Sequence, residues 1–139
     1  MITFKSMGNR IYDLNRYATS CSVPGGFSKL MEHFKRTESW VKIYTFADRC
    51  WSRGDVYLKS GFIQTEEIPP SFHGIENFRD LRINRLNYTH EKLQKRFPNL
   101  NGTQKEIMDQ AGILRIWDCG QLKFELINTN PIPTNPILG

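Results

Sequence analysis

The segment Ser22–Ser28 (SVPGGFS) constrains the fold of this chain most, because it places two glycines between a strand-like and a helix-like pattern. Residues 9–18 (NRIYDLNRYA) alternate apolar and polar side chains closely enough to form a strand. After the glycines, Ser28 is expected to cap a helix. The apolar residues that would share one face of this helix are Leu30, Met31 and Phe34. The sequence therefore predicts a strand, a glycine-containing loop and a helix, in that order.

The following residues continue an α/β pattern. Residues 40–46 (WVKIYTF) are rich in β-branched and aromatic side chains and are expected to form a strand. Residues 55–60 predict a short helix that ends at Gly61, and residues 62–68 predict a strand that Pro69 and Pro70 break. A helix that connects two parallel strands makes a crossover connection, so we expect an α/β (α+β) fold with a mixed sheet and flanking helices.

The second half of the chain predicts helices and a hairpin. Residues 78–97 are basic and are expected to be helical in their second half. Thr103 and Glu106 form a capping-box pattern, and Gly112 would close that helix. The apolar runs 113–117 and 122–126 are separated by a turn-like DCGQ segment, which predicts a β-hairpin.

We accordingly expect one domain over residues 1–127, with a core at residues 9–77 and an extension at residues 78–127. The tail, residues 128–139, carries three prolines and is expected to be extended and flexible.

Composition narrows the class of protein. The chain has 139 residues, which is enough to bury a core, and a net charge of +5, which favours anionic partners. No stretch is long and apolar enough to span a membrane, and the first ten residues lack a secretory pattern. The three cysteines are far apart in sequence, which argues against a disulfide framework and a zinc site, so a cytoplasmic location is expected. The histidines have no metal-ligand spacing, so we assign no metal.

The glycine loop is a candidate anion site. Glycine has no Cβ, so the backbone can approach a ligand closely. The backbone amides of Gly26, Phe27, Ser28 and Lys29 would point outward at the start of the helix, where the helix dipole favours negative charge. Lys29 would add a mobile cation. The alternative is a plain Gly-Gly turn without a ligand.

The segment Gly54–Phe62 (GDVYLKSGF), one strand downstream of this loop, resembles a signature of the Gcn5-related N-acetyltransferase (GNAT) superfamily. The resemblance covers the first half of the chain, as if it were the C-terminal half of that fold. It implies a GNAT-like mixed sheet that binds acetyl-CoA through the loop residues Val23, Gly25, Gly26, Phe27, Ser28 and Lys29. The strand ending at Phe46 would splay from its neighbour, and the pantetheine arm would insert between them.

The resemblance also implies a chemical mechanism. An acceptor amine would attack the thioester, and Tyr57 would protonate the departing CoA thiolate, because a phenol and a thiol have comparable pKa values. Asp48 is the candidate base. The loop departs from the family pattern, which usually has Gly or Ala at the position of Phe27 and Gln or Arg at that of Ser22, and Pro24 lacks an amide hydrogen. Tyr57 packing as a structural residue and Asp48 pairing or capping remain the alternatives.

A binding module without catalysis is the other interpretation. Arg49, Trp51 and Arg53 combine two cations with an aromatic ring, which suits phosphate contact and base stacking, or alternatively an arginine–aspartate lock. The basic run 79–96 would contact nucleic acid through Arg82, Arg85 and Lys92, or would be a solvated helix face.

The arrangement, including the closing segment 115–126 (RIWDCGQLKFEL), also resembles a domain of bacteriophage proteins, often beside homing-endonuclease-like modules. This resemblance implies nucleic acid or a host protein as the partner, and the host-cell cytoplasm as the location. Whether the chain is a fragment, and whether a second copy completes the sheet as a homo-oligomer, stays open.

Overall fold

The computed structural model describes residues 1–77 and 80–130, and it divides the chain into two compact units. Unit 1 comprises residues 1–68 together with the chain from residue 121, and unit 2 comprises residues 69–120. The chain thus leaves unit 1 after residue 68 and returns to it at residue 121. The predicted boundary between core and extension, after residue 77, lies within unit 2.

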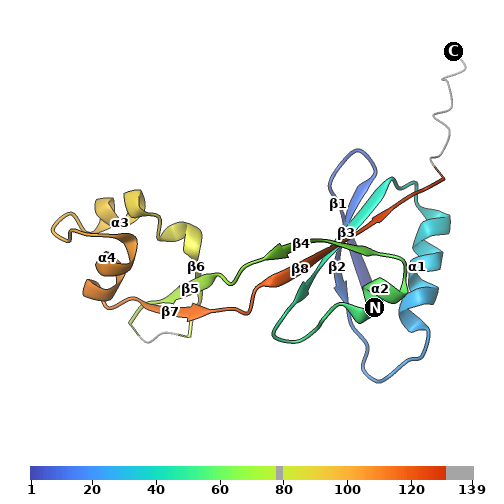
Figure 1. The fold of residues 1–139 in the computed structure, drawn as a ribbon, viewed down its shortest axis with the longest axis horizontal. Helices are drawn as coiled ribbons and strands as arrows, with labels where there is room; N and C mark the ends of the chain where they lie inside the picture. The colour runs from blue at the N-terminus through green and yellow to red at the C-terminus, as the bar shows by residue number, and fades with distance from the viewer. Residues whose placement is uncertain (78–79, 131–139) are drawn as a thin grey trace, which may run out of the picture. The chain divides into compact units, whose positions relative to one another are not determined.

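Unit 1, within the described residues, is a five-stranded mixed sheet with helices α1 and α2 (Figure 1). Its elements are β1 (Ile2–Ser6), β2 (Ile11–Tyr17), α1 (Gly26–Thr37), β3 (Lys42–Asp48), α2 (Asp55–Lys59), β4 (Ile63–Ile68) and β8 (Gln121–Ile127). The strand order is β1-β2-β3-β8-β4; β2 and β3 are parallel, and the other neighbours are antiparallel. The predicted mixed sheet with flanking helices is confirmed, whereas β1 was not predicted.

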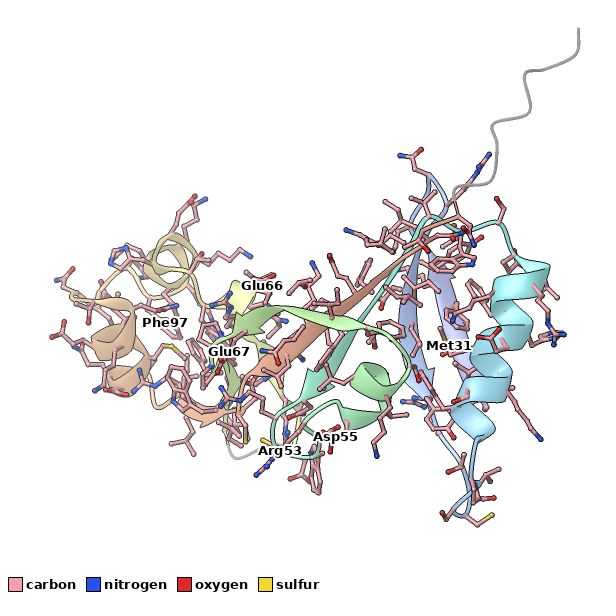
Figure 2. The ribbon with its side chains drawn as sticks, turned by 45° about the vertical axis from the view of Figure 1, so that its right-hand side comes forward. Met31, Arg53, Asp55, Glu66, Glu67 and Phe97 are labelled. Carbon is pink, nitrogen blue, oxygen red and sulfur yellow. The ribbon has the colours of Figure 1, made fainter. Side chains whose placement is uncertain are left out.

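Helix α1 forms because its apolar residues recur at helical spacing. Phe27, Met31 and Phe34 are buried, and Figure 2 shows Met31 on the side of α1 that faces the sheet. The prediction that Ser28 caps this helix is wrong, because Gly25 is the N-cap, with a φ of 71°, and the helix begins at Gly26. Glycine adopts this left-handed conformation without the steric cost that a Cβ adds. The helix therefore starts two residues before the predicted cap.

The predicted C-terminal hairpin is wrong, because its two strands belong to different sheets. Strand β7 (Leu114–Trp117) pairs with β5 (Phe72–Ile75) in unit 2. Strand β8 pairs with β3 over seven residue pairs and with β4 on its other side (Figure 1). The DCGQ segment therefore carries the chain from one unit to the other.

Unit 2 is a small α+β unit whose described strands form a sheet with the order β6-β5-β7. Its elements are β5, β6 (Ile83–Asn84), the 3-10 turn η1 (Arg85–Asn87), α3 (His90–Arg96), α4 (Gln104–Gln110) and β7. Its core consists of Tyr88, Leu93, Ile107, Met108 and Ile113. The predicted capping box of Thr103 and Glu106 is present at the start of α4, and the predicted helix in the second half of 78–97 is α3. Arg82 and Arg85 of the basic run flank the strand β6.

The buried Tyr88 of the unit 2 core takes part in a polar network with Glu76 and Arg96. The Tyr88 hydroxyl donates to Glu76 Oε1 at 3.0 Å, and the Arg96 guanidinium donates to both carboxylate oxygens of Glu76, with Nη2–Oε2 at 2.7 Å. Burial, then the Glu76 hydrogen bond and charge, raise the pKa of Tyr88 to about 12, while the charge of Arg96 lowers it. The Glu76 hydrogen bond also raises the pKa of Arg96.

The structure also bears on the predictions for the cysteines and for the C-terminal tail. Cys50 and Cys119 are disulfide-bonded, and Cys21 is an exposed free thiol. The expectation of unpaired cysteines is therefore wrong for two of the three, and it no longer supports a reducing compartment. Asn128, the first residue of the predicted tail, donates hydrogen bonds to the carbonyls of Trp40 and Val41. The tail from residue 131 lies outside the described residues, and so does Arg79 of the basic run. No helix in the described part of the chain has the length and apolar character needed to cross a bilayer.

We expect Gly54→Ala to lower the free energy of unfolding far more than Gly25→Ala does. Both glycines are helix N-caps with positive φ, 77° at Gly54 and 71° at Gly25. A Cβ at Gly54 would lie 2.2 Å from the Phe124 ring, whereas a Cβ at Gly25 would meet nothing within 4 Å. Left-handed strain costs about 1–2 kcal/mol in both variants, and overpacking adds about 1–3 kcal/mol only at Gly54. Equal losses in urea denaturation would contradict this packing.

The free energy of unfolding of the native protein should fall between about pH 10 and pH 12. Part of this fall comes from the ionisation of Tyr88 and should be absent in the Tyr88→Phe variant. Folding raises the pKa of Tyr88 from 10.0 to about 12, so its contribution is complete below pH 10 and is lost as the pH rises toward 12. Two pKa units correspond to about 2–3 kcal/mol. The measurement is the difference in unfolding free energy between native and variant across this range; a difference that stays constant would contradict the assignment.

Candidate functional site

The amino end of α1 presents two unpaired backbone amides. The amide of Gly26 donates to the Val23 carbonyl at 3.0 Å, and that of Lys29 donates to the Gly25 carbonyl at 3.0 Å. The amides of Phe27 and Ser28 have no hydrogen-bond partner among the described residues. Of the four amides expected to point at a ligand, two are therefore used within the chain. The side chains of Val23, Ser28 and Lys29 are exposed.

Phe27 connects this helix end with Tyr57. Only 4% of Phe27 is exposed, and its ring lies 5.0 Å from the Tyr17 ring and 5.8 Å from the Tyr57 ring, centroid to centroid. The Phe27 side chain is thus part of the core, and only its backbone faces the loop. Tyr57 also packs against Phe62 and Phe124, and no described residue hydrogen-bonds to its hydroxyl. The structure therefore brings Tyr57 close to the glycine loop, as a half-buried ring.

Strands β2 and β3 pair over only part of their length. Their parallel register covers Ile11–Asp13 against Lys42–Tyr44, although β2 continues to Tyr17 and β3 to Asp48. Where the pairing ends, the buried Thr45 hydroxyl donates to the Leu14 carbonyl at 2.9 Å. Strand β2 has a register shift against β1 at the same level, because Thr3 pairs with Arg16 and Phe4 with Leu14. Beyond this point the facing edges of β2 and β3 form no ladder.

Asp48 holds the loop that follows β3. Its Oδ1 accepts from the Cys50 amide at 2.9 Å, and its carbonyl accepts from the amides of Trp51 and Ser52. One oxygen of the candidate base is therefore already engaged in a turn of the Asx type. This is the capping role that the sequence left as an alternative.

A cavity of about 250 Å³ opens between α1 and the end of α2. Its lining includes Ser28, one of the predicted loop residues, and the side chains of Lys35 and Lys59. Lys35 also forms an ion pair with Glu32, which lines the cavity too. The sequence analysis did not identify the two lysines. The seven-residue spacing from Ser28 to Lys35, two helical turns, was the available signal for Lys35.

The loop between β3 and α2 borders a second cavity, of about 490 Å³, and contains the three predicted residues Arg49, Trp51 and Arg53. Trp51 is 89% exposed. Arg49 forms an ion pair with Glu67 of β4 rather than with an aspartate of the loop. Among the described residues, Arg53 has no ion-pair partner. Figure 2 places Arg53 beside Asp55 at the amino end of α2.

The basic residues of unit 2 differ in how much of their charge is already paired. Arg96 binds Glu76, Lys95 binds Glu91, and the Lys92 ammonium donates to the Leu86 carbonyl at 2.6 Å. Arg82 and Arg85 are exposed and form no ion pair within the described chain. Among the described residues of the basic run, these two arginines are therefore the cations that make no ion pair or side-chain hydrogen bond, and they belong to a different unit from Trp51.

The pKa of the Asp118 carboxyl is lowered by two backbone hydrogen bonds and by nearby positive charge, including that of Arg85. The backbone amides of Ser71 and Gly120 donate to its Oδ1 at 2.9 and 2.8 Å, and these bonds lower the pKa of Asp118. The charges of His73 and Arg85 lower this pKa further. Within the described residues, no group of three or more His, Cys, Asp or Glu side chains is arranged to hold a metal ion.

The geometry of unit 1 thus offers a helix amino end, a half-buried tyrosine and a cavity lined by lysines, and the loop after β3 offers an exposed tryptophan beside an unpaired arginine. Comparison with protein-family models, with curated proteins and with solved structures found no match for this chain.

Proposed function

We propose that unit 1 is a GNAT-like module that binds an acyl-CoA at the amino end of α1. The observation that carries this proposal is the end of the β2–β3 ladder after Asp13 and Tyr44, beside the helix that connects these two strands. Two parallel strands that separate leave backbone groups free to bind an extended arm, and the helix dipole favours the phosphates.

The proposed ligand has groups that match the surroundings of α1. The pyrophosphate would bind the free amides of Phe27 and Ser28. The cavity between α1 and α2 would receive the remaining phosphate-bearing part, near Lys35 and Lys59. The space beside Gly25 is open, because a Cβ built there would meet no atom within 4 Å.

N-Acetyl transfer is the reaction that this proposal includes. The amine nitrogen of an acceptor would attack the thioester carbonyl, the C–S bond would break, and the Tyr57 phenol would donate its proton to the CoA thiolate. The ammonium proton would leave through water toward Asp48, whose second carboxylate oxygen accepts no hydrogen bond in the described chain.

Acetyl-CoA at millimolar concentration should raise the melting temperature of the native protein and leave that of Gly26→Glu unchanged. A glutamate at the first residue of α1 places negative charge where the phosphates would bind. The matched control is Thr37→Glu, which adds the same charge at the opposite end of α1 and should retain the shift. Absence of a shift in the native protein would refute acyl-CoA binding.

Nucleic-acid binding is a second candidate function, and two observations favour it. Unit 2 exposes Arg82 and Arg85, which form no ion pair within the described chain, and the loop after β3 exposes Trp51 beside Arg53. The net charge of +5 would attract a polyanion. Under this proposal the module binds nucleic acid with or without retained affinity for acyl-CoA.

Affinity for DNA or RNA should fall steeply with salt, and the double substitution of Arg82 and Arg85 by alanine should reduce the slope. Each phosphate contact contributes about 0.7–0.9 to the slope of log K against log salt, so the double variant should lose about 1.4–1.8. The same titration with Lys95→Ala is the control, because Lys95 is already paired with Glu91. Binding that is absent or insensitive to salt would exclude this function.

A further inference from the structure

The loop between β3 and α2, residues 49–54, exposes the most accessible large apolar side chain of the described chain. Trp51 is 89% exposed, compared with 7% for Trp40 in the core and 58% for Trp117 in unit 2. An indole ring has a large apolar surface, and burying it against a partner is strongly favourable. An exposed tryptophan is therefore more informative than an exposed leucine.

This exposure does not result from a loose loop. The Asp48 carbonyl accepts from the amides of Trp51 and Ser52 at 3.0 and 2.9 Å, and the Ser52 hydroxyl oxygen accepts from the Gly54 amide at 3.0 Å. Gly54 in turn lies against the ring of Phe124, without room for a Cβ. These contacts fix the backbone of the loop that carries Trp51, so binding a ligand there would cost little backbone conformational entropy.

The cavity beside Trp51 contains both cationic and acceptor groups. Its volume of about 490 Å³ is in the range of small-ligand sites, and Arg49, Arg53 and Asp55 line it together with Trp51. The ion pair with Glu67 fixes Arg49, whereas Arg53 has no ion-pair partner among the described residues. A flat aromatic ring, a free guanidinium and a carboxylate acceptor therefore converge on one hollow of unit 1.

We propose that this hollow is a stacking site for one base of a single-stranded nucleic acid. The base would stack on Trp51, the adjoining phosphate would pair with Arg53, and Asp55 would accept from an N–H group on the edge of the base. A duplex would not fit this role, because its bases are already stacked on one another. The inference rests on the second candidate function and names the ligand class and the residues in unit 1.

The test compares Trp51→Ala with native protein in fluorescence-anisotropy titrations of a labelled single-stranded oligothymidylate and of its duplex with oligoadenylate. We expect Trp51→Ala to weaken single-strand binding by about 5- to 150-fold, since stacking on one aromatic ring supplies that range. Trp51→Phe should restore most of the affinity, because it keeps an aromatic face. Arg53→Ala should also weaken binding and should lower the salt dependence by about one phosphate contact.

The matched control is Trp117→Ala, which removes the exposed tryptophan of unit 2 and should leave single-strand affinity near the native value. Circular dichroism of each variant checks the fold, which Trp51 scarcely supports because its side chain is exposed. If the native protein binds the single strand and Trp51→Ala binds it equally well, the stacking site is refuted, while nucleic-acid binding through Arg82 and Arg85 stands. If the native protein binds neither oligonucleotide, both the site and the second candidate function are refuted.

Discussion

The insertion of β8 between β3 and β4 is the interaction on which unit 1 depends. Strand β8 pairs with β3 from Lys42–Ile127 to Asp48–Gln121, and its other edge pairs with β4. Without it, β4 would lose its ladder in the described sheet, β3 would keep only its short ladder with β2, and Phe124 would be missing from the core. Because the 52 residues of unit 2 separate β4 from β8 in sequence, closing this sheet requires a long loop closure, whose entropy grows only slowly with loop length. The chain can therefore accommodate a whole unit between two strands that share a neighbour.

Phe124 of β8 contacts residues next to both candidate sites, the Trp51 loop and the Tyr57 ring near α1. Its ring occupies the place that a side chain at position 54 would need, which favours glycine at this last residue of the Trp51 loop and N-cap of α2. The same ring lies 5.5 Å from that of Tyr57, which in turn contacts Phe27 at the start of α1. The exposed tryptophan and the half-buried tyrosine are thus positioned by one buried side chain of the last strand. A change at Phe124 would disturb both sites, whereas a change at Trp51 would leave the core intact.

The sequence predicted local features well and long-range pairing poorly, for physical reasons. The capping box at Thr103 and the positive φ at Gly61 depend on neighbouring residues, and both are present. The apolar runs 113–117 and 122–126 fit any strand partner, so they did not reveal that these strands lie in separate sheets. The disulfide bonding of Cys50 and Cys119 likewise depends on distances in space that sequence spacing does not encode. At the candidate site, the sequence indicated the glycine loop and Tyr57 as separate segments, whereas the burial of Phe27 and its ring contact with Tyr57 depend on tertiary packing.

A predicted residue is suited to bind a ligand only if its polar groups are not already paired within the folded chain. A group that is paired within the protein must break that interaction to bind, so it adds little net affinity. This argument sets aside Arg49, Arg96 and one oxygen of Asp48, which are engaged by Glu67, Glu76 and the Cys50 amide. It retains the amides of Phe27 and Ser28, the Tyr57 hydroxyl, and the cations of Arg53, Arg82 and Arg85. Every retained cation or amide can donate a hydrogen bond to an anion, so phosphate binding is common to both proposed functions. The two functions differ in the source of the phosphates. They belong either to a cofactor at α1 or to a polymer that also reaches Trp51.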